Sequence, residues 1–344
     1  MLNPYLKKAR AYRGRYRGQL STHLPMTLMA IDGLGGNEAD LERMFAKDSK
    51  QLEPYLASDA TIDRGTWRAT LGDASLEASY MRFFEAELSE HGVDSTLQTF
   101  LPTLMEGVNG GAFHPMIQTW YAREHGELED VAAALANWAC FHSTLPTPER
   151  AEEPRPDGEE STLMHIITRL RADRELQGLR AKGAYIADRA AVVASHASFL
   201  AITRDLVLTE AGLQALRSTL AQTYVGFQNF SLLHGITSAQ AMSGLLDVIP
   251  DKRAALSHYA RSLLAVYVTI GMPPSDARPA AVPALPWPEI GRAAIDTLDS
   301  HIIKLVFSCR QEHKRTGDDL YLHIARLTAT RTFRFQVRYS AEAA

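Results

Sequence analysis

Two histidines precede prolines at points where a helix is expected to begin. His23 lies two residues before Pro25, and His114 directly precedes Pro115. Proline is favoured in the first turn of a helix, so both imidazoles are expected at helix entrances. An imidazole there can project into a cavity without disturbing the hydrogen bonds of the helix. The glycines in GVNGGAFHPM give the chain room to turn just before His114.

Two further histidines, His234 and His301, lie inside helical patterns. Small residues follow His234 in HGITSAQAMSG, and they allow another helix or a ligand to approach closely. Lys304 comes one helical turn after His301 and shares its face, within the apolar run IIKLVF. Burying a lysine in such a run costs free energy unless its ammonium reaches water, pairs with an acid or is chemically altered.

Imidazoles contributed by several helices can form a metal centre inside a helical bundle. A histidine-rich set without thiolates suits iron, copper or zinc better than calcium or magnesium. A lysine kept neutral by burial can react with CO2, and the resulting carbamate would bind a metal as a carboxylate does. The chain has no local metal motif such as HExxH. The spacing therefore leaves open that each histidine is simply a packing residue.

The elements that must position these side chains are helices. Apolar residues recur at three- and four-residue steps, for example over residues 131–145 and 213–227. We therefore expect an all-α fold, a single large multi-helix domain spanning 1–344, with a histidine-lined interior pocket. The charged, proline-containing segment 147–161 predicts an exposed loop, and the proline-rich segment 271–291 an extended connector. Alternation over 331–339 is typical of a strand, so a short C-terminal strand is possible.

Composition argues against several classes of partner. The 344 residues carry a net charge of −4, so no bulk affinity for nucleic acid or anionic membranes is expected. The first twenty residues are locally basic, which favours a solvated helix face over a phosphate- or RNA-binding arm. No run is long and apolar enough to span a membrane. Cys140 and Cys309 lie in apolar helical patterns and are expected to be buried free thiols. These features predict a soluble, cytoplasmic protein.

Four blocks of the sequence, in this order, resemble the questin oxidase-like family. They are HLPMTLMAIDGLGG, GVNGGAFHPMIQTWYA, LLHGITSAQAM and DSHIIKLVFSCRQEHKRTGDDLYLHIA. The family is largely α-helical, and its members open quinone or anthraquinone rings by oxygen insertion or carbon–carbon cleavage. The resemblance implies a non-haem iron centre. Carried over block by block, its ligands would be His23, His114, His234 and His301, with a carboxylated Lys304.

The resemblance implies an oxidoreductase that acts on a small aromatic substrate with O2, with His23, His114 and His234 as catalytic residues. Asp299 and Gln240 are expected to hold imidazole tautomers. Two alternatives stay open: a metal-free or NADPH-assisted Baeyer–Villiger-type oxidase, and a non-catalytic helical binding protein. Six aromatic residues flank the expected ligands, and each can either line the pocket or simply pack between helices: Phe113, Trp120, Tyr121, Tyr224, Phe227 and Phe230.

Overall fold

Helices account for almost all of the regular structure. The computed structural model describes residues 1–148, 159–274 and 281–330. Within these residues it has seventeen α-helices, and the one sheet found there is a two-stranded hairpin, so the all-α prediction is confirmed. In chain order the helices are α1 (Leu2–Ala9), α2 (Leu24–Gly33), α3 (Glu38–Asp48), α4 (Glu77–His91), α5 (Val93–Glu106), α6 (His114–His125), α7 (Leu128–Phe141), α8 (Glu159–Ala172), α9 (Arg174–Gly178), α10 (Ile186–Ala194), α11 (Ala197–Thr203), α12 (Glu210–Gly226), α13 (Phe230–Leu245), α14 (Lys252–Thr269), α15 (Trp287–Asp296), α16 (Ser300–Thr316) and α17 (Asp319–Thr330).

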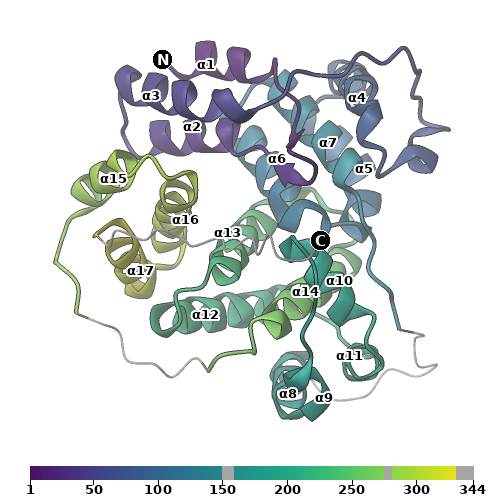
Figure 1. Ribbon diagram of the computed structural model, residues 1–344, viewed down its shortest axis with the longest axis vertical. Helices are drawn as coiled ribbons and strands as arrows, with labels where there is room; N and C mark the ends of the chain where they lie inside the picture. The colour runs from purple at the N-terminus through teal and green to yellow at the C-terminus, as the bar shows by residue number, and fades with distance from the viewer. Residues whose placement is uncertain (149–158, 275–280, 331–344) are drawn as a thin grey trace.

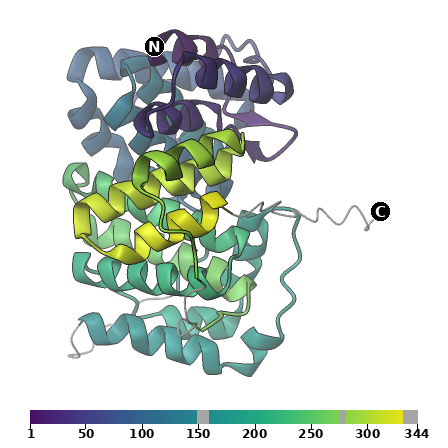
Figure 2. The same cartoon turned by 90° about the vertical axis from the view of Figure 1, so that its left-hand side faces the viewer.

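The helices are arranged in tiers. The N-terminal helices α1 to α7 form one end of the molecule, and α8, α9 and α11 form the other (Figure 1). Helices α12 to α14 lie between these ends, and α15 to α17 cover one side, as the second view shows (Figure 2). Helix α16 packs against both α2 and α13, which links the two halves of the chain. One continuous cluster of buried apolar side chains runs from α1 to α17.

Helix α13 lies at the centre and contacts α6, α12, α14 and α16. Its side chains are buried on nearly every face, as expected for a helix surrounded by others. A methyl group added at Gly235 would lie 3.2 Å from a side-chain carbon of Leu220 in α12 and 3.4 Å from one of Leu263 in α14. The small residues after His234 therefore allow close helix packing, as the sequence predicts.

The two predicted connecting segments are shorter than expected. Helix α8 begins at Glu159, so the last three residues of the predicted loop 147–161 are helical. Helix α15 begins at Trp287, inside the predicted connector 271–291, because Pro288 fits the first turn of a helix. The predicted strand at 331–339 lies outside the described residues.

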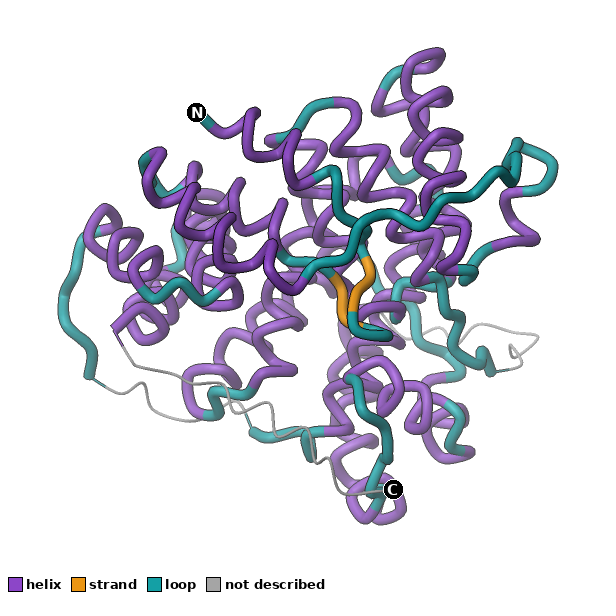
Figure 3. The backbone as a smooth tube through the Cα atoms, turned by 45° about the horizontal axis from the view of Figure 1, so that its top comes forward, coloured by secondary structure: helices purple, strands orange, loops and turns teal. Residues whose placement is uncertain are grey.

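The structure of the first twenty residues differs from the solvated helix that the sequence predicts. It is helical only over α1, and a hairpin of β1 (Arg15–Tyr16) and β2 (Leu20–Ser21) follows, drawn in orange in Figure 3. The chain reverses because Arg17 and Gly18 adopt positive φ angles of 44° and 84°. The reversal buries Tyr16 instead of leaving the whole segment in solvent.

A buried carboxylate, Glu77 at the start of α4, anchors the segment that leads into the hairpin. It accepts a hydrogen bond from the backbone N–H of Gly14 and lies 3.4 Å from Nε of Arg13. Burial raises the pKa of Glu77 to about 7, although Gly14 and Arg13 oppose the shift. The segment before the hairpin is thus bound to α4 through a carboxyl group whose ionisation lowers the stability of the folded protein.

Stability should therefore depend on pH through Glu77. The unfolded chain releases this proton near pH 4.5 and the folded chain only near 7. The free energy of unfolding contributed by this group is present below pH 4.5 and is lost as pH rises through 7, by roughly 3 kcal/mol. A Glu77→Gln variant keeps the acceptor for Gly14. We expect it to match the wild type at pH 4.5 and to be more stable at pH 8 in guanidinium denaturation.

The matched control is Glu90→Gln, an exposed position on the same helix, which should leave the pH dependence unchanged. A Glu77→Gln variant that is less stable than the wild type at pH 8 would contradict the prediction.

Two remaining sequence predictions concern thiols and membranes. Cys140 and Cys309 are both buried and free, as predicted, and burial raises the pKa of each thiol. Neither is therefore a reactive thiolate near neutral pH. Across the described part of the chain, no helix combines the length and apolar character needed to cross a bilayer.

Candidate metal centre

The chain turns sharply just before His114, which is the first residue of α6. Gly111, Ala112 and Phe113 all have positive φ angles, of 57°, 53° and 69°. A methyl group added at Gly110 would come within 1.8 Å of a backbone oxygen, so that position requires glycine. The glycines thus serve the turn that the sequence suggested, and Gly110 also allows a close backbone approach. Pro115 then starts the helix and holds the imidazole at its entrance.

The other three imidazoles come from three more helices. His23 is the N-cap residue of α2, with proline in the first turn, as predicted. His301 lies in the first turn of α16, after the N-cap residue Asp299. His234 projects from the second turn of the buried helix α13. The site therefore joins residues on both sides of the segment 147–161, as a single domain requires.

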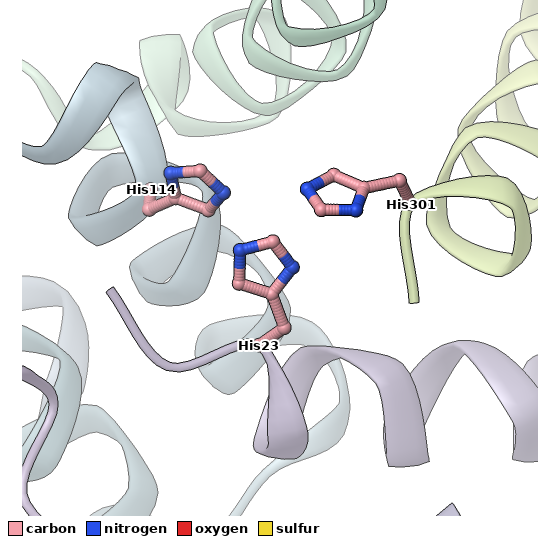
Figure 4. A group of neighbouring side chains, drawn as sticks. All are labelled: His23, His114 and His301. Atoms are coloured by element: carbon pink, nitrogen blue, oxygen red, sulfur yellow. The ribbon is translucent and has the colours of Figure 1, made fainter. Parts of the chain in front are cut away.

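The four rings gather in one place. The ring centroids of His23 and His114 are 4.4 Å apart, and those of His23 and His301 are also 4.4 Å apart. One nitrogen from each of these three residues lies within 4.8 Å of the others, a spacing compatible with one shared metal ion. Figure 4 shows ring nitrogens of His114 and His301 facing each other across a gap, with His23 below. His234 completes the group, 4.9 Å from His114 and 5.5 Å from His301 between ring centroids.

Backbone carbonyls fix the orientation of two imidazoles. Nδ1 of His114 lies 2.6 Å from the carbonyl oxygen of Gly111, and Nδ1 of His234 lies 2.8 Å from that of Phe230. A carbonyl only accepts, so Nδ1 carries the proton in both rings and Nε2 presents a lone pair. Nε2 of His114 is buried and, among the described residues, has no hydrogen-bond partner. A buried polar atom of this kind needs a partner, which a bound ligand would supply.

Asp299 lies beside His301, where a residue that orients its imidazole is expected. Its carboxylate accepts hydrogen bonds from the backbone N–H groups of His301 and Ile302, at 2.8 and 3.3 Å. The same carboxylate lies 3.7 Å from Nδ1 of His301. Gln240 does not have the predicted place: its Oε1 accepts from Ser308 at 3.5 Å, because its position on α13 turns it toward α16.

Lys304 lies against His23 and controls which nitrogen of that ring is free. Its Nζ is 3.2 Å from Nδ1 of His23, and Oγ of Ser300 lies at the same distance from that nitrogen. An ammonium can only donate, so beside a protonated Lys304 the Nδ1 atom accepts and the proton sits on Nε2. Beside a neutral or carboxylated lysine, Nδ1 can donate instead. Nε2 of His23 is then free to bind a metal.

The electrostatics favour neutral groups. Burial lowers the pKa of His23, His114 and His234 well below the usual imidazole value. Burial also lowers the pKa of His301, although its contact with Asp299 opposes the shift. Burial likewise lowers the pKa of Lys304 to about 7. The cluster is therefore uncharged at neutral pH apart from part of the lysine, and its imidazoles are available as Lewis bases.

A cavity of about 590 Å³ opens onto the four histidines. Of the six aromatic residues considered for its lining, Phe230 lines it, with its ring centroid 4.5 Å from that of His234. The other five do not line it, because their helices turn them elsewhere. Phe113 packs on Tyr259, and Trp120 and Tyr121 pack on Phe307, while Tyr224 is buried in the core and Phe227 is 41% exposed.

The first turns of five helices face this cavity, and their dipoles contribute partial positive charge to it. The helices are α2, α6, α10, α13 and α16. Each helix N-terminus carries the equivalent of about half a positive charge. The C-terminal ends of α3 and α14 also reach the cavity and offset part of this field. The balance favours an anionic ligand beside the imidazoles.

Sequence reasoning missed several residues of the cavity wall. Tyr16 comes from the hairpin, Asp48 from the end of α3, and Tyr185 and Arg189 from the start of α10. None of these lies near a histidine in the sequence, and no local pattern distinguishes them from ordinary surface residues.

Comparison with known proteins identifies a family for the chain. The sequence profile described as questin oxidase-like matches residues 20–309, most of the chain and all four histidines. The chain belongs to the questin oxidase-like family.

A more distant relative is the Baeyer–Villiger oxidase AgnL3 of Paecilomyces divaricatus. The two proteins are 23% identical over 173 residues, which cover 45% of this chain and 38% of that protein. The match thus spans well under half the length of the relative. That relative is named as an oxidase, and the family profile is described as questin oxidase-like.

Proposed function

We propose that this protein is a non-haem iron oxygenase that uses O2 to cleave, or to insert oxygen into, a ring of an aromatic or quinone-like small molecule. The observation that carries the proposal is the buried, unpaired Nε2 of His114, which lies in a cluster of imidazoles within 4.8 Å of one another. The family and the oxidase relative support oxidoreductase chemistry.

The donor set fits a transition metal. His23, His114, His234 and His301 would hold iron, and a carboxylated Lys304 would add an anionic oxygen ligand. Neutral imidazoles without thiolates are typical ligands for iron in oxygenases. Bound there, iron would supply the one-electron chemistry that allows O2 to react with an aromatic ring. Lys304 suits carboxylation because a pKa of about 7 leaves much of its amine neutral and nucleophilic.

The protein's own contribution is orientation and exclusion of water. Hydrogen bonds to Gly111 and Phe230 prevent the rings of His114 and His234 from rotating. The ring of Phe230 lies 4.5 Å from His234 and 4.7 Å from His301, and forms an apolar wall beside both. A planar substrate against this wall would be held close to the imidazoles and away from bulk water.

The electric field of the helix dipoles also affects the ionisation of a substrate in the cavity. The first turns of five helices favour the ionised form of a phenol that enters it. A phenolate is more electron-rich than the phenol and is oxidised more easily.

A metal-free or NADPH-assisted Baeyer–Villiger-type oxidase is the second candidate, favoured by the name of the relative. In that reaction the lone pair on Nε2 of His114 would act as a general base. A helical binding protein would retain the cavity without turnover. The three functions differ in whether the protein needs iron and whether it consumes O2.

The test is metal analysis joined to an oxygen measurement. We expect protein reconstituted with ferrous iron under CO2-containing buffer to hold about one iron per chain, measured by plasma mass spectrometry. It should then consume O2 with a hydroxyanthraquinone as probe substrate. O2 consumption without any bound metal would favour the metal-free oxidase. Failure to bind iron together with failure to consume O2 would favour the binding protein.

A further inference from the structure

The cavity contains one charged side chain whose charge is not compensated. Four charged residues line it. Lys47 and Asp48 approach each other at 3.7 Å, so their charges compensate. Asp299 accepts two backbone N–H groups and faces His301. Arg189 is the fourth, and within the described residues no carboxylate lies within 4.0 Å of its guanidinium.

The donors of Arg189 are also largely unused. One nitrogen, Nη1, donates to the carbonyl oxygen of Gly183 at 3.0 Å. A guanidinium offers five N–H donors in a planar fork. The adjacent acid, Asp188, is already engaged, since it accepts from the backbone N–H of Tyr185 at the start of α10. Arg189 therefore presents both its charge and spare donors to whatever fills the cavity.

Arg189 and the imidazoles belong to one continuous space but to different walls. The imidazoles come from α2, α6, α13 and α16, whereas Arg189 comes from α10. Tyr16 of the hairpin and Tyr185 of α10 line the cavity as well, and the hairpin turn at Gly18 approaches the hydroxyl of Tyr185. A volume of about 590 Å³ is large enough for a polycyclic ring with a substituent.

We propose that the ligand of this cavity carries a carboxylate, which the guanidinium of Arg189 binds while the aromatic ring lies at the histidines. The placement of the ring rests on the proposed function. A carboxylate matches the planar fork of arginine with two parallel hydrogen bonds, a geometry that lysine does not offer. A neutral ligand would leave the guanidinium of Arg189 without an anionic partner.

The experiment compares two probes with the same tricyclic ring. Binding of anthraquinone-2-carboxylate and of neutral 2-(hydroxymethyl)anthraquinone to iron-free protein is measured by calorimetry. We expect the wild type to bind the carboxylate at least tenfold more tightly, the usual value of a charge-assisted bidentate pair. Arg189→Gln keeps a donor for Gly183 and should lose this preference without weakening the neutral probe. Arg189→Lys should retain part of it.

The matched control is Arg204→Ala, an exposed arginine outside the cavity, which should leave both affinities unchanged. Equal affinity of the wild type for the two probes, equal loss of both in Arg189→Gln, or no binding of either probe would each overturn the proposal. Repeating the titration with iron-loaded protein separates the two proposals. A carboxylate preference in protein that never binds iron refutes the iron centre alone, whereas iron binding without the preference refutes the role of Arg189 alone.

Discussion

Replacing His114 with alanine is expected to lower iron affinity by roughly a hundredfold or more while the helical fold persists. Loss of a residue that merely orients a ligand costs ten- to a hundredfold, and loss of a ligand costs at least as much. Among the four clustered histidines of the described residues, the side chain removed is the one whose Nε2 is buried without a hydrogen-bond partner. The variant also loses the hydrogen bond from Nδ1 to Gly111, which should cost the iron-free protein about 1 kcal/mol. Iron content by plasma mass spectrometry and helicity by circular dichroism measure the two effects separately.

The control for this variant is His258→Ala. His258 is half-buried on α14 and does not line the cavity. It should change neither iron content nor O2 consumption. If His114→Ala retained stoichiometric iron, the centre would not use this imidazole and the proposed function would lose the observation on which it depends.

Replacing Lys304 with methionine is expected to stabilise the iron-free protein and, at the same time, to weaken iron binding. Burial lowers the pKa of Lys304 from 10.5 to about 7. The folded state therefore gains stability from this group above pH 10.5 and loses it as pH falls through 7. The full loss is roughly 5 kcal/mol below pH 7. Methionine fills similar volume without a charge, so the variant should melt higher at pH 6.5, with a difference that shrinks by pH 9.5.

The control is Lys314→Met, an exposed position on the same helix, which should change neither stability nor its pH dependence. Both measurements need CO2-free buffer, because carboxylation would remove the charge from Lys304. Iron retention is then measured with and without bicarbonate. A lysine variant that is less stable than the wild type at pH 6.5, or that binds iron with unchanged affinity, would contradict the corresponding half of the prediction.

The sequence by itself determined the helical class and the entrances of two key helices. Apolar spacing over residues 131–145 predicts what became α7, where the periodic apolar residues from Val131 to Trp138 are buried. The proline after His23 and the proline after His114 predicted helix starts, because proline is favoured only in the first turn. These are local properties, decided by a few neighbouring bonds and by burial on one helix face.

The sequence also singled out four histidines as candidate ligands. Two precede prolines, one is followed by small residues, and one shares a helix face with a lysine in an apolar run. The sequence could not show that His23 and His301, separated by most of the chain, have their rings 4.4 Å apart. Helix packing decides such distances, and packing depends on many weak side-chain contacts that no local pattern records.

Only the tertiary structure decided the wall of the cavity. Five of the six aromatic residues considered for it do not line it: four are buried in other interfaces and Phe227 is exposed, because a helix can direct a side chain near a histidine toward several neighbours or toward solvent. Tyr16 and Arg189 reach the cavity from a hairpin and from α10. Their positions follow from how the tiers of helices stack. The charge of Arg189 can act on a ligand at the imidazoles only because this stacking places both in one cavity.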